Sequence, residues 1–573
     1  NKESEEFELA QALLSKERFW DAYQVERGGR TKTEVKYRFN AARHFLYNRG
    51  FGIDFHQPNE HRFTIIDDMV VKEVDQHYIR RYMISFLENI SEWEPLEMLL
   101  RAGHQYLGPM QLANLWERKH DFNKPDKSCM YFYFESKYWK ITADGIEERP
   151  IKDLPKPIWS DQIIKFDPNL LDDPLIELDR QNGKWIETSR SEAANRCEMF
   201  RFYDYTSNFH WRKVYELKRV DGIEQYVKKP VSDLILKEDQ DKHLESLARK
   251  ILACGYMLHE YIDYSNTKMV VCMDGKESEV GRSEGGTGKS IFIKQWGKVH
   301  VSFLIDGMGP KIDEDKHVLE GVDDKTGSIV IDDADINFPT KWIFSKLTTG
   351  ITVNPKGTKA RKYAPKKMAL TTNHALRGEG NSFERRQYII TFSDYFNGNR
   401  TPNDEFGHQL FHEWDWEQWN YFYNLMATCV QHFLRHGLVA ANDKQGVLRR
   451  RMRQAIGESL VTFLNRVYNK GKENPGCYLN RRVERKYLYN QYCEENKRDA
   501  RYLDMKKFTD KLKRYCKYAD LEYNAHKNGG YVKTGNKYYH VVTDENFTQQ
   551  MLVPAIHSDL DLDKWQEVHS LPI

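Results

Sequence analysis

The sequence predicts a multi-domain α/β protein whose central unit is a parallel β-sheet beside a glycine-rich loop. Its 573 residues exceed what one hydrophobic core of roughly 100–200 residues holds, so several domains are expected. Apolar runs at residues 269–273, 328–331 and 368–370 are typical of buried strands, and a glycine-rich loop follows the first of them. A strongly basic stretch toward the C-terminus predicts a further, separate unit.

The composition favours a globular protein. Apolar residues make up 40% of the chain and aromatic residues 13%, which is ample for packed cores. No apolar run approaches the ~18 residues needed to cross a bilayer, so no membrane partner is expected. The eight cysteines form no CxxC pair and no regular spacing, which favours a reduced, intracellular compartment.

The charge is unevenly distributed along the chain. Residues 449–540 contain 23 Lys and Arg against 10 Asp and Glu, a net charge of +13, whereas the whole chain carries only +2. The remaining residues therefore sum to −11. A basic module attached to a mildly acidic body is the electrostatic pattern of a polyanion-binding protein. The alternative is a solvated, lysine-rich surface.

Residues 1–125 are predicted to form a mostly helical domain. Residues 41–47 have helical apolar spacing and stop before Gly50, a natural helix C-cap. Residues 63–71 have the pattern of a strand pair, and Asp75 is placed to cap the helix that follows.

Residues 126–235 are predicted to be a β-rich subdomain. Residues 130–134 and 138–141 flank a turn, and aromatic-rich runs follow at 199–205 and 209–215. Such stripes can stack unpaired bases, but packing in a core is the better interpretation.

Residues 236–264 are predicted to be a helical linker or collar, because an apolar face runs along residues 237–261. The central unit then covers residues 265–440. Its last part, around Trp414 and on to Gly437, is predicted to be a helical lid.

The glycine-rich loop has the pattern of a phosphate-binding loop. Its glycines let successive N–H groups converge on one anion, a lysine reaches the terminal phosphates, and a hydroxyl binds the accompanying Mg²⁺. A flexible glycine turn is the alternative, and Ser283 stands where the full pattern has glycine. The predicted ATP-binding residues are Gly285, Gly286, Thr287, Gly288, Lys289 and Ser290.

Polar side chains end the strands that follow the loop. Asp332 and Asp333 form an acidic pair suited to hold Mg²⁺ and to polarise the attacking water, so Ser290 and Asp332 are the predicted metal ligands. Asn373 ends the next strand, where it could hydrogen-bond the γ-phosphate and the lytic water. A surface Asp pair closing an ordinary strand is the alternative.

Two basic features complete this constellation. Arg385 and Arg386 precede a strand, and arginine suits stabilisation of a transferring phosphoryl group, often across a subunit boundary. A hairpin is predicted around residues 355–357, and its charge could couple hydrolysis to a phosphate backbone. A solvated loop is the alternative. The predicted DNA-contacting residues of the hairpin are Lys356, Lys359, Arg361 and Lys362.

The order of phosphate loop, Asp pair, basic hairpin, Thr-Thr-Asn strand and Arg pair resembles that of superfamily 3 helicases. More narrowly, it is similar to the helicase part of primase-helicases from phages, large DNA viruses and mobile elements, with an N-terminal helper region that resembles that of poxvirus primase-helicases. The resemblance covers about Lys268–Phe392. It implies an AAA+-type P-loop ATPase core that uses ATP and Mg²⁺ and forms a ring, usually a hexamer. Single-stranded DNA would thread this ring, typically with 3′ to 5′ translocation.

The resemblance also assigns roles and partners. Asn373 becomes the γ-phosphate sensor, Lys356 or Lys359 the pore contact, and Arg385 or Arg386 the arginine finger of a neighbouring subunit. The expected substrates are single-stranded and forked duplex DNA in the cytoplasm of a bacterial host. A primase or polymerase domain, as a preceding region or as a partner, stays open.

Residues 449–545 are predicted to be a basic winged-helix DNA-binding domain, followed by an acidic tail at 546–573. Helices are expected at residues 459–468, 482–496 and 505–519, with two strands at 531–532 and 538–542. The third helix is predicted to face DNA phosphates through Lys506, Lys507, Lys511, Lys513 and Arg514.

The sequence therefore favours an ATP-dependent DNA helicase. Two other functions stay open: a signalling or defence ATPase that switches an assembly, and an origin-binding protein whose nucleotide only organises an oligomer. Positive charge in a pore, as on the predicted hairpin, is needed only by a translocating ring.

Overall fold

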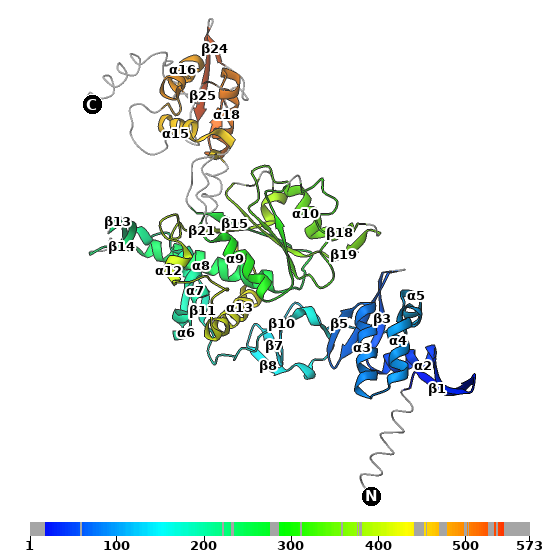
Figure 1. The fold of residues 1–573 in the computed structure, drawn as a ribbon. Coiled ribbons are helices and arrows are strands. Elements are labelled where there is room, and N and C mark those ends of the chain that lie inside the picture. The colour runs from blue at the N-terminus through cyan, green and yellow to red at the C-terminus, as the bar shows by residue number, and fades with distance from the viewer. Residues whose placement is uncertain are drawn as a thin grey trace.

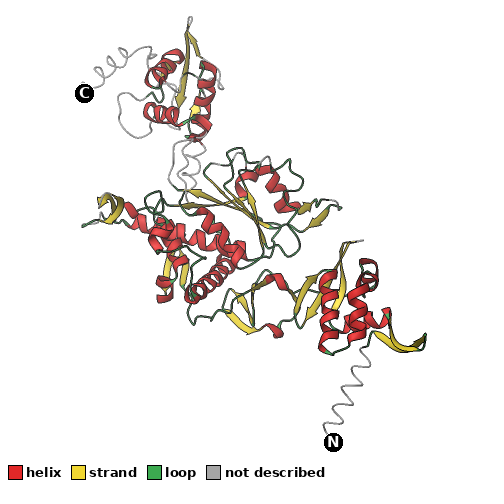
Figure 2. Cartoon of the chain, viewed as in Figure 1, coloured by secondary structure: helices red, strands yellow, loops and turns green. Residues whose placement is uncertain are grey.

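The computed structural model describes three units, drawn in Figure 1 and coloured by secondary structure in Figure 2. We call them the N-terminal unit (residues 18–125), the central unit (126–440) and the C-terminal unit (452–543). The described residues are 18–57, 60–220, 223–230, 234–275, 286–309, 312–356, 359–374, 376, 381–440, 452–453, 455–468, 478–497, 501, 503–524, 532–534 and 537–543. Within them, no helix has the length and apolar character needed to cross a membrane.

The N-terminal unit mixes strands and helices, so the expectation of a mostly helical domain is wrong for its described part. Its elements are the hairpin β1 (Trp20–Arg27) and β2 (Arg30–Tyr37), α2 (Phe39–Asn48), the strands β3 (Phe51–Gln57), β4 (Glu60–Asp67) and β5 (Val70–Val74), and the helices α3 (Gln76–Asn89), α4 (Trp93–Tyr106) and α5 (Pro109–Leu112). The missed strand β3 places Phe51 and Ile53 in the core of the unit, but Gly52 and Asp54 are buried as well, so its burial does not follow a simple alternation. The expected Asp75 cap is present, with its carboxylate accepting from the Tyr78 N–H at 2.8 Å.

The first part of the central unit is built from small sheets whose pairings are antiparallel except for one short parallel pair. Its strands are β6 (Cys129–Phe134), β7 (Lys137–Thr142), β8 (Ile146–Pro150), β9 (Ile158–Trp159), β10 (Ile163–Ile164), β11 (Ile176–Gln181), β12 (Lys184–Arg190), β13 (Tyr215–Val220) and β14 (Ile223–Lys228). The expected hairpin of β6 and β7 is present. Strand β9 pairs with β5 and so joins the sheet of the N-terminal unit.

The central sheet is parallel and has the strand order β16-β17-β20-β15-β21. Its strands are β15 (Met269–Asp274), β16 (Ser302–Asp306), β17 (Ser328–Asp332), β20 (Lys367–Thr372) and β21 (Gln387–Phe392). From β15 the chain goes to the β16 edge, returns through β17 and β20, and crosses β15 to reach β21. In open α/β sheets, ligands bind beside such a reversal, at the carboxyl ends of the strands.

Both faces of the central sheet are covered, which explains the unbroken apolar runs in the sequence. Val270 and Cys272 of β15 face one hydrophobic core, whereas Val271 and Met273 face another. The first core contains α7 (Glu198–Ser207), α8 (Lys237–Leu258), α9 (Lys289–Lys294) and α13 (Trp416–His436), and the second contains α10 (Thr340–Thr349). The shorter helices are α6 (Glu192–Arg196), α11 (Asn381–Arg385), α12 (Pro402–Phe406) and the 3₁₀ turns η1 (Ile151–Asp153), η2 (Ser160–Gln162), η3 (Trp211–Lys213) and η4 (Gln295–Lys298).

Three helices differ from the sequence prediction. The aromatic run at residues 199–205 is not a strand but part of α7, which starts where the Cys197 sulfur accepts from the Phe200 N–H. Helix α8 is not a linker, because residues 246–258 are all buried in the core of the sheet. At Gly255 a Cβ would lie 2.0 Å from the Cys429 carbonyl oxygen of α13, so these helices cross in direct backbone contact. Helix α13, expected as a lid, is accordingly part of the core.

The C-terminal unit combines helices with a small sheet. The helices are α15 (Glu458–Val467), α16 (Arg485–Glu495) and α18 (Met505–Tyr518), and the strands are β22 (Arg482–Glu484), β23 (Glu522–Tyr523), β24 (Val532–Thr534) and β25 (Lys537–Thr543). The expected helices and hairpin are therefore present, but residues 482–484 pair with β25 as a strand. The acidic tail lies outside the described residues.

Candidate functional site

The candidate site lies at the carboxyl ends of β15, β17 and β20 in the central sheet. These three strands are neighbours and parallel, so Asp274, Asp332 and Thr372 finish at the same edge. Helix α9 starts at Lys289, directly after the glycine-rich loop, and packs against β17 and β20. The topology thus brings the loop, the acidic pair and the Thr-Thr-Asn segment together, as the sequence predicts.

Only part of the glycine-rich loop is described, from Gly286 onward; Ser283 and Gly285 lie outside the described residues. Gly288 has φ 94°, and a Cβ there would lie 2.6 Å from the Phe202 ring of α7. Glycine is therefore required at this position on two grounds, its left-handed backbone and the close approach of an aromatic ring. Phe202 thus lies directly against the loop at Gly288, a contact that the sequence did not reveal.

Lys289 is held by residues at the start and end of the loop. Its ammonium donates to the Asp274 carboxylate and, at 3.3 Å, to the Thr287 hydroxyl. Thr287 also donates to Asp274 at 2.6 Å. The Lys289 and Asp274 side chains are each only 10% exposed. Asp274 was not among the predicted site residues, although its place as the last residue of the strand before the loop is a signal that could have found it.

Asp332 is the centre of a hydrogen-bond network. One carboxylate oxygen accepts from the Ser290 hydroxyl at 2.7 Å and from the Thr371 hydroxyl at 2.9 Å, and the other pairs with the Lys294 ammonium at 2.9 Å. Burial alone would raise the pKa of Asp332, but hydrogen bonds from Lys294, Ser290 and Thr371 outweigh it and lower the pKa below 3.8. The carboxylate is therefore ionised at neutral pH.

Asp333 and Asn373 occupy the ends of adjacent strands. Asp333 has φ 59°, an uncommon backbone for a non-glycine residue, and its N–H donates to the Thr371 hydroxyl at 2.7 Å. The next N–H, of Ala334, donates to the Thr371 carbonyl at 2.7 Å, so the turn is fastened to β20. The Asp333 side chain is exposed, and Asn373, directly after β20, is half-buried. Thr371 and Lys294 are further site residues that the sequence did not single out.

Arg385 and Arg386 lie at the opposite side of the sheet, where the strands begin. They directly precede β21, whose first residue pairs with Met269 at the amino end of β15. A six-residue strand is about 20 Å long, so neither guanidinium reaches the Asp332 edge of its own sheet. Arg385 is exposed, whereas Arg386 is half-buried with its guanidinium 5.7 Å from the centre of the Phe344 ring.

The predicted basic hairpin is present. Strands β18 (Ile351–Val353) and β19 (Arg361–Tyr363) pair antiparallel, and Lys356, Lys359 and Lys362 are exposed while Arg361 is half-buried. The tip is attached to the preceding loop, because the Lys356 N–H donates to Glu320 at 3.1 Å.

The basic helix of the C-terminal unit is α18. Its exposed cations are the predicted Lys506, Lys507, Lys513 and Arg514, together with Lys517. Lys511 differs, because it is half-buried and donates to the Ile456 carbonyl at 2.6 Å, so its ammonium is directed into the unit. The expectation that Lys511 faces DNA therefore needs correcting.

Comparisons with known proteins give little further guidance. No family model matches the chain, and no curated protein matches it. Two solved structures of the C-terminal region of NrS-1 are similar to it, with TM-scores of 0.30 and 0.28 and sequence identities of 11% and 13%. Each alignment covers 72% of this chain, and 97% and 96% of those chains. A likeness at this level establishes neither fold nor function.

Proposed function

We propose that the chain is an ATP-dependent DNA helicase with an AAA+-type P-loop core of the superfamily 3 kind, acting in replication of a phage or mobile element. One observation carries the proposal: Lys289, Ser290 and Asp332 converge at the carboxyl ends of neighbouring parallel strands. The hydrogen bond between Ser290 and Asp332 places a hydroxyl and an ionised carboxylate together beside the loop lysine.

The residues of this edge fit ATP with Mg²⁺. Mg²⁺ prefers oxygen ligands, is usually held by one or two carboxylates and keeps several waters, and it would supply charge neutralisation on the phosphates. Ser290 and Asp332 would hold the metal. Lys289 would exchange Asp274 for the terminal phosphates, and the exposed Asp333 carboxylate would accept a proton from water. Asn373 would orient that water.

Motion along DNA is assigned to the basic hairpin β18–β19. Its exposed lysines are suited to contact phosphates of a single strand, and its attachment to the loop before β17 supports coupling to the Asp332 strand. Arg385 or Arg386 would act in a neighbouring subunit of a ring, a hexamer by resemblance, because its own site is out of reach. The polarity of 3′ to 5′ likewise comes from the resemblance.

The test is strand displacement on forked DNA by the wild type and by Lys289→Ala, with ATP hydrolysis measured in the same samples. We expect the wild type to hydrolyse ATP and separate strands, and Lys289→Ala to do neither. A chain that hydrolyses ATP on single strands but separates none would refute the helicase proposal and favour a switch ATPase. DNA binding without hydrolysis would favour an origin-binding protein.

A further inference from the structure

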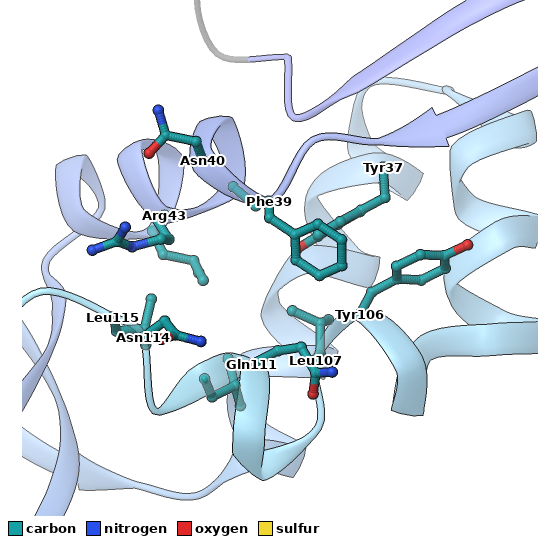
Figure 3. A pocket seen from close by; sticks show the side chains of 12 residues that line it. Tyr37, Phe39, Asn40, Arg43, Tyr106, Leu107, Gln111, Asn114 and Leu115 are labelled. Atoms are coloured by element: carbon teal, nitrogen blue, oxygen red, sulfur yellow. The ribbon is translucent and has the colours of Figure 1, made fainter.

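The N-terminal unit contains a cavity of about 400 Å³ between α2 and the segment that follows α4. Figure 3 shows aromatic rings at one end of this cavity, Arg43 at the other, and two side-chain amides on the side opposite α2. None of the residues described above for hydrolysis or DNA movement lines it. The full lining is Tyr37, Phe39, Asn40, Ala42, Arg43, Leu46, Tyr106, Leu107, Gln111, Leu112, Asn114 and Leu115.

The aromatic end offers a stacking platform. Phe39 is 50% exposed, and its ring centre lies 5.0 Å from that of Tyr37 and 6.2 Å from that of Tyr106. Tyr37 is buried, and its ring stacks on that of Tyr106 with 4.8 Å between the ring centres. The Phe39 ring therefore packs against a pair of rings that is itself held in place. A large aromatic ring half in water at the mouth of a cavity provides a free π-face for another flat group.

The other end offers a cation and hydrogen-bonding amides. The Arg43 guanidinium lies 5.0 Å from the centre of the Trp116 ring, a cation–π contact that restrains the side chain. The Arg43 Nε is buried and has no hydrogen-bond partner among the described residues, so this N–H group lacks an acceptor. In Figure 3 the Gln111 and Asn114 amides lie between Arg43 and the rings. Asn114 uses its N–H on the Met110 carbonyl at 3.1 Å, which leaves its own carbonyl oxygen to accept.

No aspartate or glutamate lines the cavity, so an anion meets no repulsion there. We propose that this cavity binds one nucleotide of a single-stranded nucleic acid, with the base stacked on Phe39 beside Tyr106 and its phosphate toward Arg43. Amides that both donate and accept suit the edge of a base. An apolar peptide side chain fits worse, because it would desolvate Arg43 and both amides without offering them partners.

The site is independent of the proposed hydrolysis. It belongs to a different unit, and it holds a strand whether or not the chain unwinds DNA. In a helicase, a strand could then contact the protein at two separate places, this cavity and the β18–β19 hairpin.

The test is photo-crosslinking of the full chain to short single strands that carry one iodouracil base, with matched DNA and RNA strands as separate arms. Crosslinked peptides are mapped by mass spectrometry. We expect crosslinks at the peptides of Phe39 or Tyr106. Phe39→Ala should raise the strand concentration that half-saturates this crosslink by roughly 5- to 150-fold, the range for losing one stacking ring. Phe39→Trp should keep it.

Trp93→Ala is the matched control, because Trp93 is an exposed aromatic residue of the same unit that does not line the cavity. It should leave the crosslink unchanged. Arg43→Gln should lower the dependence of log affinity on log salt by about 0.7, as for one lost phosphate contact on a single strand. The proposal is overturned if crosslinks map only to the β18–β19 hairpin or the C-terminal unit, or if Phe39→Ala behaves like Trp93→Ala. ATP hydrolysis, measured alongside, reports separately on the proposed helicase.

Discussion

At the scale of single residues, the pair of Lys289 and Asp274 sets the cost of nucleotide binding. Both side chains are nearly buried, and the ammonium also donates to Thr287. A phosphate that binds Lys289 must therefore break the ion pair between Lys289 and Asp274 and replace its interaction energy. Asp274 would compete with the nucleotide for the same lysine.

Asp274→Asn should make the chain depend on ATP for stability. Removing one partner leaves a charge buried without its counterpart, which costs about 3–5 kcal/mol of unfolding free energy. Phosphates restore that partner, so we expect a lower Tm without ATP and a larger rise with Mg-ATP than in the wild type. Differential scanning fluorimetry measures both. Asp306→Asn is the control, because Asp306 also ends a strand of the sheet but contacts the Met308 N–H instead. Equal rises in Asp274→Asn and wild type would contradict this role.

At the scale of elements, the apolar strands were the most predictable part of the chain. Runs such as 328–331 are buried on both faces, so their hydrophobicity is continuous and their polar ends are conspicuous. Helix α7 was missed because its dense aromatic residues are as typical of a strand as of a buried helix. Its helical state depends on packing against α8 and on the Cys197 cap, which are features of the folded core.

The site was predictable to the same degree. Lys289, Ser290 and Asp332 were identified because their spacing follows a known pattern. Lys294 and Thr371 contact Asp332 from α9 and β20, and no spacing rule marks such contacts. Asp274 was missed although it ends the strand before the loop, a position that could have marked it. Residues 283 and 285 lie outside the described part of the chain, so the predictions for Gly285 and Ser283 stay predictions.

The β18–β19 hairpin should govern the response to DNA. Lys359→Ala removes an exposed charge from the tip, so we expect DNA-stimulated ATP hydrolysis to fall severalfold while hydrolysis without DNA stays near the wild-type rate. A coupled ATPase assay with and without single-stranded DNA measures both. Lys341→Ala, an exposed lysine of α10, is the control and should change neither. An equal loss with and without DNA would place Lys359 in hydrolysis itself.

The C-terminal unit should weaken in mild acid through His540. Burial lowers the pKa of His540 to about 3, and the ring faces the Tyr468 hydroxyl at 2.8 Å. Because the folded pKa lies below the unfolded value of 6.5, protonation of His540 favours the unfolded state. The free energy of unfolding is therefore unaffected by this group above pH 6.5 and decreases as the pH falls toward 3. The loss approaches about 1.4 kcal/mol per pH unit.

His540→Gln cannot titrate, so hydrogen exchange in α15 and α18 should become less sensitive to pH between 6.5 and 4.5. The central unit provides an internal control. Burial also lowers the pKa of His259 to about 4 and that of His300 to about 3, so this unit should keep its own acid sensitivity in the variant. An unchanged pH response of α15 and α18 would show that His540 is not the group responsible.

At the scale of the whole molecule, the position of the arginine pair has a consequence for assembly. Arg385 and Arg386 lie at the amino edge of the sheet, and Lys289 lies at the carboxyl edge. If the chain forms a ring, one subunit brings its arginines to the lysine of the next. The exposed Arg385 is better placed for that contact than the half-buried Arg386.

Mixing two inactive variants should therefore restore ATP hydrolysis. Lys289→Ala lacks the phosphate contact but keeps its arginines, and Arg385→Ala has the reverse defect. Mixed rings contain interfaces in which an intact Lys289 meets an intact Arg385, so we expect hydrolysis well above that of either variant alone. The same experiment with Arg386→Ala tests the other arginine. A mixture no more active than its components would exclude action between subunits.

The burial of α8 determines how this chain can be divided. A cut at residue 236 or 264, where the sequence suggests a boundary, would either leave α7 behind or strip residues 246–258 from the sheet and expose the face of α13 that they cover. The smallest piece expected to fold on its own therefore starts near residue 126. A protease acting on the folded chain should accordingly release a fragment that still carries the β6–β7 hairpin, and a gene fragment beginning at β15 should yield insoluble protein.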